Sequence, residues 1–154
     1  MKITILTVGK LGRMVEAQLA LDYASRATAS GRALALGPVE ILEVEARKPG
    51  KAAEAEVLRP HLEGAHVIAC DEHGSARPSR AFATEIGRLR DDGVRRLVFV
   101  IGGADGLDPT LLDQANGKLA FGPQTWPHAL ARAMLTEQVY RAVTILAGGP
   151  YHRD

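Results

Sequence analysis

Hydrophobic positions in this chain form short runs that alternate with longer stretches of mixed polarity. The runs hold four to seven residues, are rich in β-branched side chains and end at glycine or polar residues, which is typical of buried strands. The stretches between them have helical composition. The pattern predicts strands at Lys2–Val8, Val39–Val44, His66–Asp71 and Arg96–Ile101, and helices at Val15–Ser30, Ala52–Glu63 and Ser79–Asp92. Such alternation predicts an α/β fold with a mostly parallel sheet and helices on both faces.

Two local features refine these helices. In the first, Val15, Leu19, Ala20, Tyr23 and Ala24 fall on one face. In the second, Pro60 is expected to kink or end the helix, because proline lacks the amide hydrogen that the helix needs there.

The alternation weakens after Leu107. Asp108-Pro109 is typical of a helix start, so we expect a short helix to about Ala115. A short strand is expected at Lys118–Phe121, followed by a turn-rich loop and a last helix from about His128 to Ala147. No repeat or linker interrupts the chain, which favours a single domain over residues 1–154.

Composition narrows the function. Of 154 residues, 46% are hydrophobic and 24% charged, and the formal net charge is +1. This balance excludes a strongly basic nucleic-acid module but leaves room for a local RNA-binding patch, completed by a second subunit. The single cysteine, Cys70, fits a reducing cytosol, and Ile3–Val8 is too short to span a membrane. We therefore expect a cytoplasmic protein without a membrane segment.

Ligands of parallel sheets bind beyond the carboxyl ends of the strands, which directs attention to the loops after Cys70 and Ile101. The second of these is Gly102-Gly103-x-x-Gly106. Its glycines allow close backbone approach to a ligand, although a tight turn without a ligand would use them equally well. The loop is neither a dinucleotide fingerprint nor a P-loop.

The loop Gly122–Pro127 is a second candidate wall. Its two prolines stiffen the backbone, whose amide and carbonyl groups can read the edge of an adenine ring. Phe121 and Trp126 add aromatic surface. The alternative is a structural turn with Trp126 in the core.

Several side chains are candidates for proton transfer or anion binding. Histidine suits proton transfer near neutral pH, and arginine binds phosphate or carboxylate. For the arginines, the alternative is an ion pair with Glu137 or exposure at the surface. The candidates for proton transfer are His128, His152, Asp105, Glu137 and Tyr151, and those for anion binding are Arg132 and Arg141.

The remaining histidines, the cysteine and a basic loop give weaker indications of a functional site. His61, His66 and His73 lie in three different predicted elements, so no metal site is expected. Cys70 lies within a strand and is interpreted as a packing residue. The basic loop Arg47–Lys51 can contact phosphate, although most such loops are simply solvated.

The chain resembles the RlmH-type (YbeA-like) ribosomal RNA methyltransferases of the SPOUT class over essentially its whole length. The resemblance is densest near the carboxyl end, where chain termini ordinarily drift. It rests on the first strand with Lys10, Lys48-x-Gly50-Lys51, Asp71-x-x-Gly74, Ile101-Gly102-Gly103-x-x-Gly106-Leu107, Pro127-His128-x-Leu130-x-Arg132, Glu137-Gln138-Val139-Tyr140-Arg141-Ala142 and Pro150-Tyr151-His152-Arg153.

The resemblance implies a specific reaction and architecture. Members of this family transfer a methyl group from S-adenosylmethionine to N3 of a pseudouridine in large-subunit (23S) ribosomal RNA. They are homodimers whose cofactor pockets lie near the subunit interface. Their carboxyl-terminal part forms a trefoil knot, an exception to the rule that chains do not thread their own loops.

The resemblance also implies roles for individual residues. Tyr151, His152 and Arg153 would hold the target base, with His152 as the leading proton acceptor, while His128 and Arg132 would support the pocket or bind phosphate. Cys70 stands where leucine is common and Trp126 is bulkier than usual, but both keep an apolar wall. The implied cofactor-binding residues are Cys70, Gly102, Gly103, Phe121, Gly122, Pro123, Gln124, Thr125 and Trp126.

Three alternatives stay open at this point. The chain could be a SPOUT enzyme that methylates another RNA. It could be a non-catalytic ribosome-associated module that keeps the fold. It could also be an unknotted nucleotide-binding protein. The tail and the short chain argue against the first, and the glycine loop and the tail argue against the second.

Overall fold

Five parallel strands form the central sheet of the computed structural model, which describes residues 1–153. Their order across the sheet is β2-β1-β4-β3-β5, with every neighbouring pair parallel. The strands are β1 (Lys2–Val8), β2 (Val39–Val44), β3 (His66–Ser75), β4 (Arg96–Ile101) and β5 (Gly117–Leu119). The predicted parallel sheet is confirmed.

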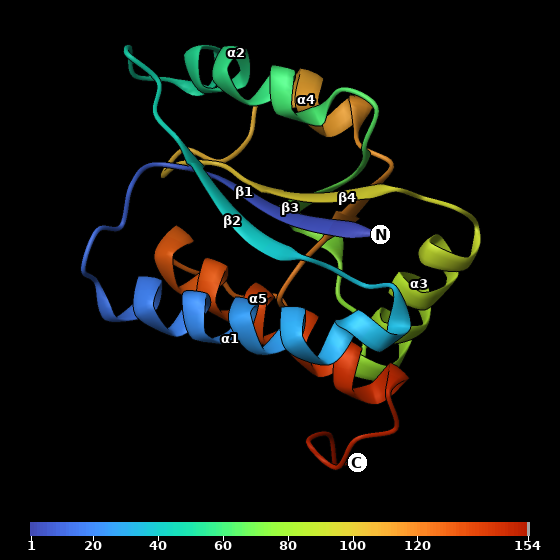
Figure 1. Cartoon of the computed structure of the whole chain (residues 1–154). Coiled ribbons are helices and arrows are strands. Elements are labelled where there is room, and N and C mark those ends of the chain that lie inside the picture. The colour runs from blue at the N-terminus through green and yellow to red at the C-terminus, as the bar shows by residue number, and fades with distance from the viewer. Residues whose placement is uncertain (154) are drawn as a thin grey trace.

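Helices cover both faces of the sheet (Figure 1). One face carries α2 (Lys51–Leu62) and α4 (Pro109–Gln114), and the other carries α1 (Val15–Gly31), α3 (Ser79–Asp91) and α5 (His128–Leu146). A short 3₁₀ turn, η1 (Arg32–Leu34), follows α1. The chain ends beyond α5, on the side of the α1–α5 layer away from the sheet (Figure 1). No helix in the described part of the chain is both long and apolar enough to cross a membrane.

Alternating side chains of the central strands build two cores. Ile3 and Ile5 of β1 pack toward α1, α3 and α5, whereas Leu6 and Val8 pack toward α2 and α4. This two-residue period is what a strand buried on both faces requires. Burial on both faces also explains why these strands read as continuous apolar runs in the sequence.

Helix α1 packs through a narrower face than the sequence suggests. Ala20 and Ala24 are buried, together with Ala17 and Ala27, whereas Val15 is 75% and Leu19 43% exposed. The shared face of Val15, Leu19, Ala20, Tyr23 and Ala24 is therefore not the packing face. Alanines at the contact let α1 and α5 approach closely, and this turns the larger side chains outward.

Strand β3 runs further than predicted, to Ser75, because it pairs with β5 twice. Cys70 and Ser75 are both in register with Leu119, and the four residues between them bulge out of the ladder. Gly74 allows this crossing, since a Cβ there would lie 2.7–2.8 Å from backbone atoms of β5. The Asp71–Gly74 bulge is thus pushed toward the carboxyl end of the sheet.

The remaining boundaries agree closely with the predicted ones. Helix α2 continues two residues past Pro60, so the proline stands in its last turn. The Asp108 side chain caps α4 by accepting a hydrogen bond from the Thr110 amide at 2.9 Å. Strand β5 ends at Leu119, two residues before the predicted end.

Candidate active site

A cavity of about 700 Å³ opens at the carboxyl ends of β3 and β4. Parallel sheets place their ligands at this edge, and the volume suits a cofactor-sized molecule. Eight of the nine predicted cofactor-binding residues line it, all but Pro123, which stands exposed beside it. His128 lines it too. The structure therefore brings together in one cavity three stretches that lie far apart in the sequence.

The glycine loop forms one wall and is closed by its own backbone. Gly106 donates its amide to the Gly103 carbonyl at 3.0 Å. A Cβ on Gly102 would lie 2.7 Å from the carbonyl carbon of Gly106. Gly102 is therefore needed so that the loop can fold back on itself, independently of any ligand.

The loop after β5 forms the facing wall. The Trp126 indole donates to the Phe121 carbonyl at 3.2 Å, and this hydrogen bond joins the two ends of the loop. Thr125 donates to the Glu72 carboxylate at 3.1 Å and so ties this loop to the β3 bulge. Trp126 is 39% exposed, so the alternative that places it in the core is wrong.

Charges around the cavity favour a cationic ligand. The carboxylates Asp71, Glu72 and Asp105 line it, against one ammonium group, Lys51. Asp71 also accepts from the His73 amide at 3.0 Å, which holds the turn of the bulge. An excess of negative charge at a partly enclosed site attracts a positive ligand such as a sulfonium.

Cys70 faces the cavity as an uncharged group. Burial, reinforced by the nearby Asp71 carboxylate, raises the pKa of the Cys70 thiol to about 12. The thiol therefore stays protonated at physiological pH and is a poor nucleophile. This supports the interpretation of Cys70 as an apolar wall residue.

Arg132 lies beside the cavity but is buried. Its guanidinium, in a side chain that is 1% exposed, pairs with Glu43 and donates to the Gly9 carbonyl at 3.1 Å. Glu43 also accepts from the Leu11 amide at 3.1 Å. Arg132 thus joins α5 to the ends of β1 and β2, and its burial favours support of the site over phosphate binding.

The carboxyl-terminal tail lies against its own helix α5. The Tyr151 hydroxyl donates to Glu137 at 2.9 Å, and its ring packs at a tilt of 58° against the Tyr140 ring, with centroids 4.7 Å apart. The Arg141 guanidinium lies over the Tyr151 ring, with its central carbon 4.8 Å from the ring centroid. Burial and the hydrogen bond to Glu137 raise the pKa of the Tyr151 hydroxyl, so it acts as a donor.

The arrangement of His152 sets its tautomer. Arg141 Nη1 lies 3.3 Å from His152 Nδ1. Because a guanidinium can only donate, Nδ1 accepts this hydrogen bond and a neutral ring carries its proton on Nε2. Nδ1 of His152 is thus engaged within its own protomer.

The tail and the cavity are separate within one protomer. Neither Tyr151 nor His152 lines the cavity, and neither does Arg132. Glu137 and Arg141 form an ion pair with each other, with the nitrogen and oxygen 2.5 Å apart, which is the alternative foreseen for Arg141. Asp105 does line the cavity. Of the side chains predicted for proton transfer, the structure therefore places His128 and Asp105 in the cavity with the cofactor-binding residues.

Sequence reasoning missed some of the lining. Lys51 and Leu112 reach the cavity from α2 and α4, which sit above the sheet. Both residues occupy ordinary helix positions, and the pattern of polarity around them does not distinguish them from their neighbours. Lys51 is noticed only as part of the Lys48-x-Gly50-Lys51 match. No group of acidic, histidine or cysteine side chains in residues 1–153 is arranged to hold a metal ion.

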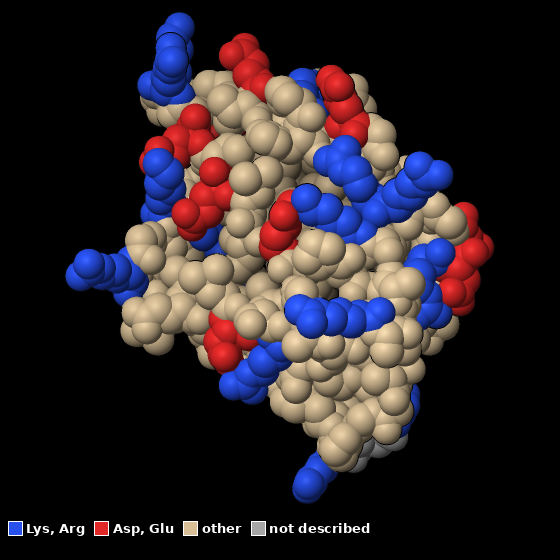
Figure 2. Space-filling model, in the orientation of Figure 1, with Lys and Arg blue, Asp and Glu red and all other residues tan. Residues whose placement is uncertain are grey.

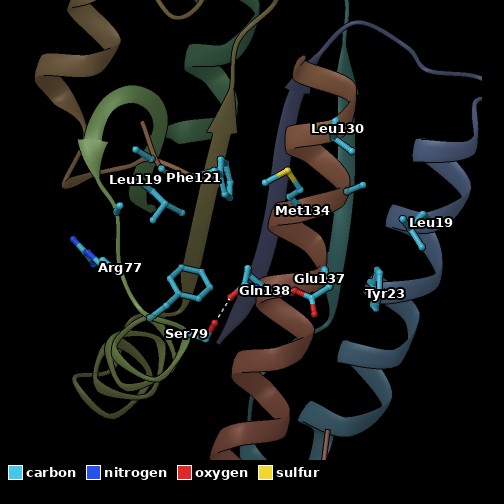
Figure 3. A pocket seen from close by; sticks show the side chains of 15 residues that line it. Leu19, Tyr23, Arg77, Ser79, Leu119, Phe121, Leu130, Met134, Glu137 and Gln138 are labelled. Carbon is cyan, nitrogen blue, oxygen red and sulfur yellow. Dashed lines mark hydrogen bonds between the residues drawn. The ribbon is translucent and has the colours of Figure 1, made fainter. Parts of the chain in front are cut away.

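A second groove, of about 440 Å³, lies between α1, α3 and α5 (Figure 3). Leu19 and Tyr23 reach it from α1, and Leu130 and Met134 from α5. Ser79 donates to Gln138 at 2.8 Å across one end of it. Phe121 and Gly122 line both hollows, so the groove is continuous with the wall of the cavity.

Comparison with known proteins places this architecture. Residues 1–152 match the family described as "Predicted SPOUT methyltransferase". The chain is 87% identical over 154 residues to a Caulobacter sp. (strain K31) protein and 76% identical to a Phenylobacterium zucineum protein, with both members of each pair fully covered. Both relatives are named "Ribosomal RNA large subunit methyltransferase H".

Two solved structures share the fold at low sequence identity. A probable methylase family protein from Haemophilus influenzae superposes with a TM-score of 0.58 at 12% identity, covering 99% of this chain and 70% of that one. A probable methyltransferase from Bordetella pertussis gives 0.54 at 10% identity, covering 92% and 96%. The parallel sheet is consistent with the knot that the resemblance implies. From the family match over almost its whole length and from these relatives, this chain belongs to the SPOUT methyltransferase family.

Proposed function

We propose that this protein methylates N3 of a pseudouridine in large-subunit ribosomal RNA with S-adenosylmethionine as the methyl donor. The observation that carries the proposal is the single cavity that gathers eight of the nine expected cofactor-binding residues. The names of relatives at 76–87% identity supply the substrate class. In bacteria such a substrate would place the protein in the cytoplasm.

The residues of the cavity fit the methyl donor. Leu107, Leu119 and Ile101 give an apolar surface for an adenosine. Backbone groups of Gly122–Trp126 can bind the edge of the adenine ring, and the carboxylate excess suits a positive sulfonium. When bound, this donor supplies an already activated methyl group. The protein then has to align the target nitrogen and accept a weakly acidic imide proton.

A methylation assay tests this function. Purified protein with radiolabelled S-adenosylmethionine should label ribosomes from a strain that lacks the enzyme, and mass spectrometry should locate the label at one pseudouridine. Transfer to tRNA instead would favour another SPOUT specificity. Binding of the donor without transfer to any RNA would favour a non-catalytic module.

We further propose that the active form is a homodimer and that the tail of one subunit completes the cavity of the other. Within one protomer the tail lies against α5, away from the cavity. The apolar groove of Leu19, Tyr23, Leu130 and Met134 is continuous with the cavity wall and suits a second subunit. Lys and Arg are interspersed with Asp and Glu on the face shown in Figure 2, so a dimer would also join basic side chains from two copies.

The dimer proposal predicts a position-dependent effect of charge. Leu130→Asp is expected to convert the protein to monomers at micromolar concentration, because it places a carboxylate in the apolar groove proposed to meet the second subunit. Leu21→Asp is the matched control, since Leu21 is 60% exposed on α1 but does not line the groove. Sedimentation velocity measures the mass. A monomeric unmutated protein, or dissociation of the Leu21 variant alone, would contradict the proposal.

A further inference from the structure

The glycine loop of the cavity is held from outside by one side chain, Glu54. Gly103 donates its amide to Glu54 Oε2 at 3.1 Å. The carbonyl of the same residue accepts from Gly106 at 3.0 Å. Both backbone polar groups of Gly103 therefore have a hydrogen-bond partner within the protein, and its amide is not available to a ligand.

The carboxylate of Glu54 also occupies the space that a side chain at position 103 would take. A Cβ on Gly103 would lie against Glu54 Oε1 and 3.0 Å from Glu54 Cδ. Gly103 does not have a positive φ, so its backbone conformation is open to other residues. Gly102 differs, because a Cβ there meets the backbone of Gly106 and Leu107. A side chain at position 103 would therefore displace the Glu54 carboxylate, whereas one at position 102 would displace the loop backbone.

Helix α2 carries this contact in its first turn. The Glu54 side chain accepts the Gly103 amide, while the Glu54 backbone amide donates to the Gly50 carbonyl at 3.1 Å. Lys51, three residues earlier on the same helix, lines the cavity. The start of α2 and the glycine loop are thus joined into one unit on the α2 face of the sheet.

From these contacts we propose that Glu54 is a positioning residue for the methyl-donor site, which acts through the amide of Gly103 and fixes the glycine loop against α2. The proposal rests on the proposed function, because it takes the cavity as the donor site. Glu54 does not line the cavity, so its effect is on loop geometry rather than on direct contact.

Three substitutions test the hydrogen bond. Glu54→Ala is expected to weaken S-adenosylmethionine binding by about tenfold, the effect of one lost hydrogen bond to a charged group. Glu54→Gln keeps an acceptor oxygen and should recover most of the affinity. Glu56→Ala, an exposed carboxylate on the same helix, is the matched control and should change nothing. Calorimetric titration gives the affinity, and thermal unfolding shows that each variant is folded.

A double-mutant cycle measures the coupling between positions 103 and 54 in donor affinity, and general destabilisation of the fold would not produce such coupling. Gly103→Ala should weaken binding because its methyl group displaces the Glu54 carboxylate. In Gly103→Ala/Glu54→Ala the clash is gone, so the pair should bind no more weakly than Glu54→Ala alone. Gly102→Ala combined with Glu54→Ala should instead show additive losses, because Gly102 meets backbone rather than Glu54.

Two results would overturn the assignment while leaving the proposed function intact. One is normal affinity in a folded Glu54→Ala protein, or a Gln variant as weak as the Ala variant. The other is additive loss for the Gly103 and Glu54 pair. Failure of the unmutated protein to bind S-adenosylmethionine would instead contradict the proposed function itself.

Discussion

Methyl transfer by a His152→Ala variant is expected to fall by about a hundredfold or more, which is the usual contribution of a general acid–base group. The affinity for S-adenosylmethionine should stay within about threefold of normal, because His152 does not line the cavity of its own subunit. Single-turnover methylation and calorimetric titration measure the two quantities. His61→Ala, a histidine on α2 outside both the tail and the cavity, is the control.

The environment of His152 makes this prediction more specific. In the docked tail, Nδ1 accepts from Arg141, so this nitrogen already has a partner within its own protomer. Contact between Nδ1 and a target base therefore needs the tail to leave α5 and break this hydrogen bond. Equal losses of transfer and of donor affinity in His152→Ala would contradict the assigned role of the tail.

Gly102→Val is expected to give the opposite profile, with loss of S-adenosylmethionine binding as the primary defect. A Cβ at this position meets backbone atoms of Gly106 at 2.7–2.8 Å, so the loop must open and the cavity wall must shift. Overpacking of this kind costs about 1–3 kcal/mol, and if the whole cost falls on the form that binds the donor, the affinity drops by roughly five- to 150-fold. Calorimetric titration of a folded variant measures it, with far-UV circular dichroism to check the fold. Unchanged affinity would show that the loop does not border the donor.

Mixing these two variants tests whether the tail acts across subunits. Gly102→Val has an intact tail and a damaged cavity, whereas His152→Ala has a damaged tail and an intact cavity. After unfolding and joint refolding, random pairing should give about a quarter of sites with both parts intact if the tail reaches the partner subunit. If the tail served its own cavity, no mixed dimer would contain an intact site and no activity would return.

Local patterns were sufficient for most of the fold. Strand bounds at Lys2–Val8, Val39–Val44 and Arg96–Ile101 were predicted to the residue. In β1 and β4 the reason is burial on both faces, which leaves nearly unbroken apolar runs. Family resemblance located the residues of the cavity for a related reason, since their spacing in sequence is fixed by the loops that follow the strands. Pairing between distant segments could not be predicted in this way. The double contact of β3 with Leu119 depends on where a distant segment passes.

The sequence alone determined the alternation of elements, the parallel sheet and the edge at which a ligand binds, since these follow from periodicity and from the handedness of short connections. Only the tertiary structure decided what distant side chains do. It buried Arg132 against Glu43, turned Leu19 outward, placed Tyr151 on Glu137 and set Glu54 against Gly103. The physical reason is that each of these states depends on a partner many positions away or on the closeness of helix packing, and a local pattern of polarity carries neither.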